Sequence, residues 1–439
     1  MQLAEYHLFN YKSYWYLYII SSGKAYRINN KFADSLKQIS ENDADPESEF
    51  IPLLRKINLL NRNTSSNQHL LSPVKTPIKS LELNIAQRCN MRCIYCYGDQ
   101  GTYRNPGFMN QKIAGSVLDW ISENRRFAKK VSIIFFGGEP LLNFKLLKWI
   151  VTNCRERTAS SGQKFRFAIT TNGSFFRSEI VDFLNQHRFS VTVSLDGDSA
   201  VQNRNRPFKN GALSYQKIAP DIVNFLKTRN GQAFARATLA AGFNGLQPIL
   251  GTLQKLGFKR YDYAMVSGAG TKPFLLTDRD FATLLADLEI VCEKYLQEFC
   301  NNGGVSSPRI LALIQALKSK KPVQYFCGAG KGMLAVSSSG EIFPCHRFVG
   351  WKKMQMGTIT NYSDSARDSY FNLSVAQSQI CKDCWVRNLC GGGCMYENMV
   401  YSGNLLTPNT RHCLEMKKRT EMVIYICDRL RTLNKAKLN

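Results

Sequence analysis

The sequence predicts an α/β fold, in which a partial (β/α)6 TIM-like barrel follows a small N-terminal α+β unit and precedes a Cys-rich, irregular C-terminal domain. Three observations support this prediction. Apolar strand segments alternate with helix-like segments from Leu81, a pattern typical of parallel strands joined by right-handed crossovers. The opening residues instead place strand-like segments in direct succession. After Phe326, short segments rich in glycine and cysteine replace both patterns.

Residues 1–60 are predicted to form the opening unit. Its aromatic and β-branched segments predict three strands, over Tyr6–Tyr11, Tyr14–Ile20 and Lys24–Ile28. Helices are expected over Lys31–Ile39, where Asn30 is a suitable N-cap, and over Pro46–Leu60. Residues 61–78 are polar and contain two prolines, so we expect a linker there.

Residues 79–277 are predicted to form the barrel, which has six strand–helix units and is therefore open along one side. Its strands are expected at Leu81–Ala86, Val131–Phe136, Phe165–Thr170, Ser190–Leu195, Phe234–Leu239 and Tyr261–Val266. Helices between them include Leu141–Thr158, Glu179–His187, Tyr215–Lys227 and Leu246–Leu256. A helical bridge is expected over 278–326, a cysteine-rich domain over 327–420, and a C-terminal helix with a basic tail over 421–439.

Composition excludes several classes of protein. With 439 residues, 44% of them hydrophobic, the chain can bury a large core, which argues against a disordered, collagen-like or disulfide-stapled protein. The longest apolar run near the start, Tyr14–Ile20, is far shorter than the roughly 20 residues of a membrane span. The first residues also lack a basic segment and a cleavage site, so a cytoplasmic protein is expected.

The net charge of +25 favours contact with an acidic partner, such as nucleic acid, anionic lipid or an acidic peptide. A basic protein without a charged partner is the alternative. The sequence contains no Arg-Gly repeat and no dense block of Lys and Arg, so nothing favours nucleic acid over the other acidic partners.

The 14 cysteines are unevenly distributed. In a reducing compartment, clustered thiols indicate soft-metal ligands rather than disulfides. Cys89, Cys93 and Cys96 directly follow the first barrel strand in a C-x3-C-x2-C loop. Three thiolates leave one iron of a cubane 4Fe–4S cluster without a protein ligand, so a small molecule can bind there. A structural zinc site would need four ligands.

This loop resembles the signature of the radical S-adenosylmethionine (SAM) superfamily, and the agreement covers most of residues 79–267. Gly137-Gly138-Glu139-Pro140 is similar to the GGEP motif of that family. The resemblance implies that SAM binds the open iron and yields a 5′-deoxyadenosyl radical that abstracts hydrogen from a substrate. An electron donor such as flavodoxin or ferredoxin is also implied. The implied SAM contacts are Tyr95, Gly137, Gly138, Glu139, Thr170, Asn172, Ser194, Asp196, Arg204, Arg206 and Arg236.

The later cysteines resemble the SPASM extension of one radical SAM branch, which holds two auxiliary 4Fe–4S clusters. That resemblance assigns Cys327, Cys345 and Cys394 to the inner cluster (auxiliary cluster I), and Cys381, Cys384, Cys390 and Cys413 to the outer one (auxiliary cluster II). The inner set is one thiolate short. A water, a nearby side chain, Cys292 or Cys300 could fill the position, or it could stay open for a substrate. A zinc ribbon is excluded because Cys384 and Cys390 are too close in sequence.

SPASM proteins characteristically modify peptides and proteins, so the resemblance implies a precursor peptide as substrate. The segment Phe343–Gly350 looks like that of ribosomal-peptide (RiPP) maturases, which install thioether or carbon–carbon cross-links. Sulfatase-maturing enzymes, the alternative, carry an Asp where this chain has His346. His346 is a candidate general base, and a plain surface histidine is the other interpretation.

The opening unit resembles the winged-helix peptide-recognition module of such maturases. We therefore expect the leader of the precursor peptide to add as a strand along an exposed edge near Tyr14–Ile20. A structural cap on the barrel is the alternative. Two further alternatives are a nucleic-acid-modifying radical SAM enzyme and a non-catalytic electron carrier, which would have no reason to keep Glu139.

Overall fold

The computed structural model describes residues 3–42, 48–60 and 75–436. The chain divides into two compact units. The barrel unit comprises residues 73–284 and 327–373, and the terminal unit comprises residues 1–72, 285–326 and 374–439. Most of the expected linker, residues 61–74, lies outside the described residues, as do the first two residues of the helix expected from Pro46.

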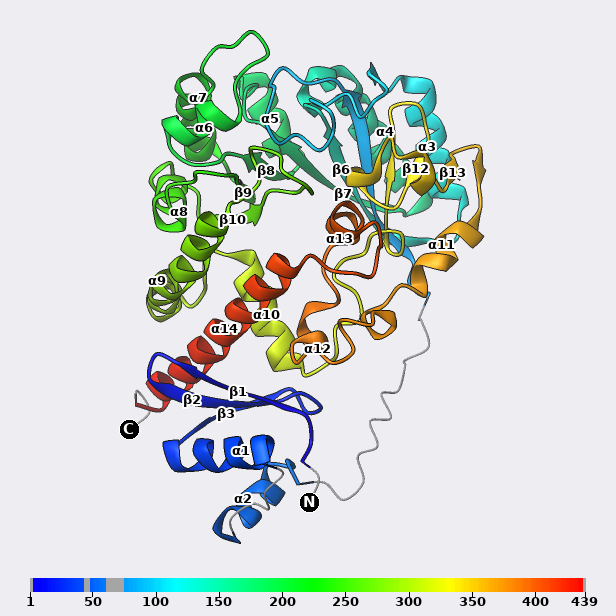
Figure 1. Ribbon diagram of the computed structural model, residues 1–439. Coiled ribbons are helices and arrows are strands. Elements are labelled where there is room, and N and C mark those ends of the chain that lie inside the picture. The colour runs from blue at the N-terminus through cyan, green and yellow to red at the C-terminus, as the bar shows by residue number, and fades with distance from the viewer. Residues whose placement is uncertain (1–2, 43–47, 61–74, 437–439) are drawn as a thin grey trace. The chain divides into compact units, whose positions relative to one another are not determined.

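A nine-stranded sheet forms the centre of the barrel unit, with the order β10-β9-β8-β7-β6-β4-β11-β12 and β5 paired with β4 (Figure 1). All six expected barrel strands are confirmed and run parallel: β4 (Ile78–Gln87), β6 (Phe127–Gly137), β7 (Lys164–Thr171), β8 (Ser190–Ser194), β9 (Ala233–Leu239) and β10 (Arg260–Met265). Three short strands complete the sheet: β5 (Gly107–Phe108), β11 (Met333–Val336) and β12 (Ile342–Phe343). The sheet does not close, as expected for an incomplete barrel.

Helices cover one face of this sheet. Val131, Ile133 and Phe135 of β6 are fully buried while their neighbours are half-exposed, because successive strand side chains point to opposite faces. The helices are α3 (Gln111–Glu123), α4 (Phe144–Ser161), α5 (Ser178–Gln186), α6 (Ser199–Asn205), α7 (Tyr215–Thr228) and α8 (Leu246–Lys255). The shorter elements of the unit are η2 (Pro140–Asn143), η3 (His346–Phe348), η4 (Lys352–Met354), β13 (Gly357–Thr358), β14 (Asn361–Tyr362) and α11 (Asp364–Phe371).

The terminal unit contains a three-stranded antiparallel sheet of β1 (Tyr6–Tyr11), β2 (Tyr14–Ile19) and β3 (Lys24–Ile28). Leu17 and Ile19 of β2 pack in one core with α1 (Asn30–Asn42) and α2 (Ile51–Lys56). On the other face lies α14 (Thr410–Ala436; Figure 1). The Tyr16 hydroxyl of β2 donates to Asp428 of this helix at 3.1 Å. The remaining elements are η1 (Ser48–Phe50), α9 (Asp278–Asn302), α10 (Pro308–Ser319), η5 (Val375–Gln377), α12 (Arg387–Cys390) and α13 (Met395–Ser402).

Two expectations for the terminal unit are wrong. Tyr14–Ile20 is no sheet edge, because β2 is the central strand and pairs with both β1 and β3. The helix expected over Pro46–Leu60 is instead the short pair η1 and α2. It ends early because Asn58 has a left-handed backbone (φ 59°), and the Leu59 amide turns back to the carbonyl of Leu54.

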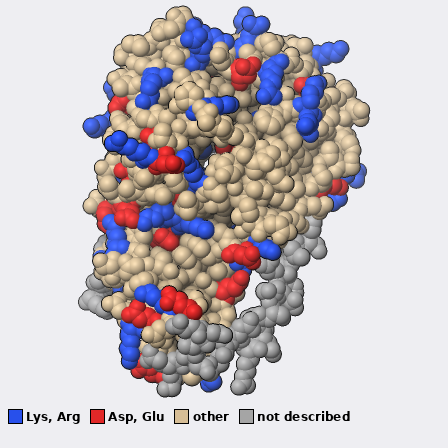
Figure 2. Space-filling view, viewed as in Figure 1, with Lys and Arg blue, Asp and Glu red and all other residues tan. Residues whose placement is uncertain are grey.

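On the face shown in Figure 2, Lys and Arg side chains are spread out with acidic side chains among them. In the part of the chain that the structure describes, no helix is both long and apolar enough to cross a bilayer.

Candidate active site

The C-x3-C-x2-C loop lies at the carboxyl end of β4, where the Cys96 amide closes a turn on the Cys93 carbonyl. The three thiols share one electrostatic environment. Burial raises the pKa of Cys89 to about 11 and that of Cys93 to about 12, with nearby Cys96 adding to both shifts. Arg206 opposes both shifts, which places a cation beside the loop.

Glu139 joins the ends of β6 and β7. Its carboxylate is fully buried and accepts from the Thr171 hydroxyl at 2.8 Å, the Asn172 amide at 2.7 Å and the Leu141 amide at 3.1 Å. The Asn172 side chain in turn donates to Asn90 of the cysteine loop at 2.8 Å. Burial raises the pKa of Glu139 to about 7, and a cation beside the carboxylate would favour its charged form.

Gly137 and Gly138 let this turn pass close to the cysteine loop. A Cβ on Gly137, whose φ is 136°, would lie 2.2 Å from the Ala86 carbonyl oxygen. A Cβ on Gly138 would lie 2.3 Å from the carbonyl oxygen of Arg88, the residue before Cys89. Both positions therefore exclude any other residue.

A buried triad lies on the other side of the loop. The Tyr95 hydroxyl donates to Asp196, and Arg206 donates to the same hydroxyl at 2.9 Å. Asp196 is fully buried and also accepts from the Thr238 amide at 3.0 Å. The Nε atom of Arg206 is shielded from solvent and has no hydrogen-bond partner in the described chain. That unsatisfied donor suits an anionic ligand group.

The other implied SAM contacts lie on β7, β8, α6 and β9. Thr170 and Ser194 are half-buried at the ends of β7 and β8. Arg204 is exposed and donates to the Gly242 carbonyl at 2.9 Å. Arg236 is an exposed residue of β9, in register with Ser194.

His346 is held by a residue that the sequence did not single out. Glu82, buried on β4, contacts Nδ1 of His346 at 2.8 Å and accepts from its backbone amide at 2.7 Å. The imidazole lies 4.1 Å, between ring centres, from Phe136. Asn84, two residues after Glu82, is fully buried and its amide has no partner in the described chain. These side chains form a polar group on the inner face of the sheet.

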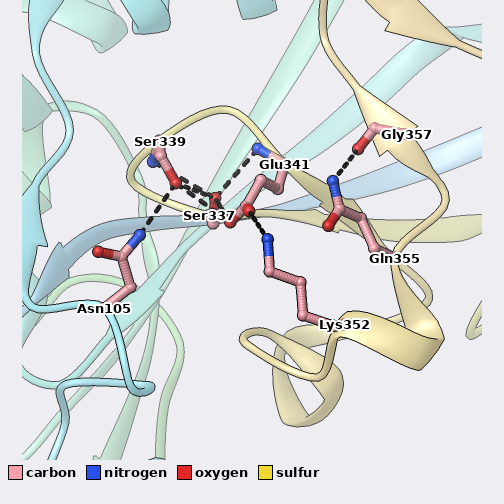
Figure 3. A network of polar contacts seen from close by, with 7 residues as sticks. All are labelled: Asn105, Ser337, Ser339, Glu341, Lys352, Gln355 and Gly357. Carbon is pink, nitrogen blue, oxygen red and sulfur yellow. Dashed lines mark hydrogen bonds and ion pairs between the residues drawn. The ribbon is translucent and has the colours of Figure 1, made fainter.

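Residues after the cysteine loop are fixed by two polar contacts that sequence analysis also missed. Gln87 at the end of β4 donates to the Asn105 carbonyl at 2.7 Å and accepts from the Ser338 amide at 2.7 Å. Figure 3 shows the adjoining network, in which Asn105 reaches Ser339, and Glu341 links the serines to Lys352 at 3.5 Å. The turn between β11 and β12 thereby braces the loop.

In the terminal unit, four cysteines predicted as ligands line one small cavity of about 20 Å³: Cys381, Cys384, Cys390 and Cys413. Backbone amides of Gly392 and Gly393 hydrogen-bond to the Cys390 sulfur. Both glycines have left-handed backbones (φ 87° and 77°), which turn successive N–H groups toward an anion. Four thiols therefore line this cavity, and two backbone donors lie beside one of them.

Cys327 and Cys345 belong to the barrel unit, and Cys394 precedes α13 in the terminal unit. Buried Lys331 lies near Cys327, and burial lowers the pKa of this lysine to about 8. Within the described residues, no three His, Cys, Asp or Glu side chains are close enough to hold a single metal ion.

Residues 83–218 match the family model described as the radical SAM superfamily. An uncharacterised protein of Methanocaldococcus jannaschii is 33% identical over 276 residues, which are 62% of this chain and 86% of that protein. The chain belongs to the radical SAM superfamily. It is a radical SAM enzyme, and SAM and a 4Fe–4S cluster are the cofactors that this membership implies.

More distant radical SAM relatives have names that describe their activity. A cysteine-type anaerobic sulfatase-maturating enzyme of Clostridium perfringens is 22% identical over 335 residues, 72% of this chain and 89% of that enzyme. The structure of anSMEcpe with bound AdoMet has a TM-score of 0.68 at 20% identity and covers 80% of this chain and 98% of its own. SuiB of Streptococcus suis, bound to precursor peptide SuiA, has a TM-score of 0.53 at 16% identity and covers 93% and 98%.

The residues of the barrel unit fit the two cofactors. Cys89, Cys93 and Cys96 are the soft donors that an iron–sulfur cluster requires, with a position to spare for SAM. Buried Glu139 suits the SAM amino group because the hydrogen bonds that it accepts within the described residues come from neutral donors. The unpaired Nε of Arg206 suits the carboxylate.

Proposed function

We propose that this radical SAM enzyme is a peptide maturase with three 4Fe–4S clusters, which installs an oxidative cross-link, carbon–carbon or thioether, in a ribosomally made precursor peptide. The observation that carries the proposal is the convergence of Cys381, Cys384, Cys390 and Cys413 on one cavity. An additional cluster suits an oxidation, because a net oxidation needs an electron acceptor.

The barrel unit would position the chemistry. The Cys89 loop would hold the first cluster, while Glu139 and Arg206 would orient SAM through its amino and carboxylate groups. When bound, these cofactors supply one-electron cleavage of SAM and hydrogen abstraction from the substrate. We propose that His346, oriented by Glu82, accepts the proton that the oxidised residue releases; the carboxylate at Nδ1 leaves Nε2 as the accepting atom.

Sulfatase maturation is the second candidate, because a sulfatase-maturating enzyme is among the relatives and the fold matches anSMEcpe. The two functions differ in their products. A cross-linked peptide loses two hydrogens for each bond, whereas a formylglycine replaces a Cys or Ser side chain with an aldehyde.

The test is an anaerobic reaction of the reconstituted enzyme with SAM, dithionite and candidate peptides, followed by mass spectrometry. We expect 5′-deoxyadenosine and a peptide that has lost pairs of hydrogens. An aldehyde that reacts with a hydrazine would instead favour sulfatase maturation. No change in any peptide, with 5′-deoxyadenosine formed, would contradict both.

For the leader, we propose β3 as the docking strand in place of β2. β3 pairs with β2 alone, and a groove of about 910 Å³ runs beside it in the terminal unit. Of its lining residues, Asp428 alone is acidic and already accepts from Tyr16. The basic lining residues are Lys24, Arg27, Lys318, Lys320 and Arg431. An extended acidic segment with apolar side chains suits this groove.

Leader binding can be measured by fluorescence anisotropy with an acidic leader peptide. Lys318→Glu with Arg431→Glu should weaken binding at least tenfold, and added salt should weaken the wild-type complex. Unchanged affinity in the double variant would exclude the groove.

A further inference from the structure

His412 is an unexplained residue in the wall of the outer cysteine cavity. It lies in the first turn of α14, directly before Cys413, and lines the same cavity as the four cysteines. Its Nε2 atom is shielded from solvent and has no hydrogen-bond partner in the described chain. An imidazole nitrogen left unpaired in a protein interior is costly, so it indicates a missing partner.

The surroundings of the ring show where that partner lies. A Cβ built on Gly393 would lie 3.3 Å from Cδ2 and 3.7 Å from Nε2 of His412. This edge of the ring therefore faces the turn whose amide binds the sulfur of Cys390. The Phe326 ring meets the imidazole edge-on, with 5.6 Å between centres.

Arg309 and Arg419, the two cations that act electrostatically on the imidazole, carry only donors. The sulfurs of the four cysteines that line the same cavity are acceptors available to an N–H at this position. A hydrogen bond to a cluster sulfur stabilises the reduced state, which carries one more negative charge, and so raises the reduction potential.

We propose that His412 donates a hydrogen bond from Nε2 to a sulfur of auxiliary cluster II and raises the reduction potential of that cluster. His412 is thus a tuning residue, and the ligands remain Cys381, Cys384, Cys390 and Cys413. This inference depends on the outer cluster of the proposed function. It explains why the chain places an imidazole beside a site that already has four thiolates.

The experiment is a potentiometric titration followed by electron paramagnetic resonance, in a background with Cys89, Cys93 and Cys96 changed to alanine. His412→Phe should move the midpoint of the outer cluster to a more negative potential without loss of iron. His412→Gln, which keeps an N–H donor, should restore part of the shift. His187→Phe is the matched control, because His187 also has a shielded, unpaired ring nitrogen but lies in the barrel unit.

An unchanged midpoint in His412→Phe would overturn the proposal, and so would a loss of one cluster of iron from both His412 variants, which would indicate a ligand or structural role. Cys384→Ser identifies the signal of the outer cluster. If Cys384→Ser loses neither iron nor a signal, the outer cluster itself is absent, and the three-cluster part of the proposed function fails with it.

Discussion

Two groups of cysteines in this chain occupy different environments. Around Cys89, Cys93 and Cys96, buried charges dominate: Glu139, Asp196 and Arg206 all lie within interaction range. The outer cavity has no carboxylate among its described lining residues; backbone amides of Gly392 and Gly393 donate to Cys390, and the buried cation Arg387 lines the cavity. In both, burial raises the pKa of the thiols, to about 12 for Cys93 and about 11 for Cys390, so cluster assembly must release protons.

The difference follows from what each group is built to bind. A loop of three thiolates must also recognise the charged ends of SAM, and buried charges give that recognition strength. A cavity lined by four cysteines would leave no ligand position for SAM, and it has no carboxylate among the described residues lining it that could bind an amino group. Cysteine spacing predicts both sites, and their different surroundings are consistent with the different roles that we propose for them.

Removing the cysteines of one group at a time should have the largest effect on iron content and SAM cleavage. Changing Cys89, Cys93 and Cys96 to alanine should abolish 5′-deoxyadenosine formation and leave most of the iron. Cys384→Ser should lower the iron content and keep SAM cleavage. Iron and product assays on the same samples check both. If iron fell to zero in the triple variant, the auxiliary sites would be wrongly assigned.

The two groups also use glycine for different reasons. Gly138→Ala would put a methyl group 2.3 Å from the Arg88 carbonyl, so we expect the cysteine loop to be displaced and SAM binding to be lost. In Gly392→Ala, the new methyl group would have no atom closer than 3.8 Å. The expected loss in folding stability, about 1–2 kcal/mol, comes from the left-handed backbone at this position. Gly251→Ala, in open space on α8, is the neutral control. Calorimetric measurement of SAM binding and thermal melts distinguish the three glycine variants. Wild-type SAM affinity in Gly138→Ala would contradict the packing argument.

The charged site should make stability depend on pH. Because burial raises the pKa of Glu139 from 4.5 to about 7, folding retains a proton that the unfolded chain releases. The cofactor-free protein should therefore lose stability as pH rises from 4.5 to 7, by about 3 kcal/mol. Saturating SAM on the cluster-loaded enzyme should reduce this slope, because its amino group compensates the carboxylate. Urea titrations at pH 5.5 and 7.5 measure the change in the free energy of unfolding. In the Glu139→Gln variant, this pH dependence should be lost.

Much of this could be predicted from the sequence because the signals are local. Alternating apolar segments located all six barrel strands, and cysteine spacing located both groups of thiols. The edge of the small sheet could not be predicted, since Tyr14–Ile20 is apolar enough for either an edge or a central strand. Its position became clear only from the pairing of β2 with both neighbours.

The surroundings of the site were harder to predict because they depend on contacts between residues that are distant in the sequence. Glu82 and Gln87 are polar residues in a largely apolar strand, and each has a partner more than 250 residues away in the sequence. Arg204 and Arg206 look equivalent in sequence. Arg204 lies in the last turn of α6 and is exposed, whereas Arg206, where the backbone leaves the helix (φ −134°), is buried.

Removing one hydroxyl from the charged site should have a moderate effect. Tyr95→Phe leaves Asp196 without one donor and Arg206 without its acceptor, so unfolding should become easier by about 1–3 kcal/mol. A thermal melt of the reconstituted enzyme measures the loss. Tyr215→Phe, a partly exposed tyrosine at the start of α7, is the control, and equal melting temperatures for both variants would argue against the triad.

The smallest effect is expected at Arg204. The resemblance to the family allowed Arg204, Arg206 and Arg236 as contacts of the SAM carboxylate, but Arg204 is exposed and held by the Gly242 carbonyl. Arg204→Ala should thus change stability by no more than about 0.5 kcal/mol and leave SAM affinity unaltered. Arg206→Ala, which removes the buried cation beside Cys93, should weaken SAM binding at least tenfold. Isothermal titration of both variants with SAM decides between them, and a weaker complex in Arg204→Ala alone would reverse the assignment.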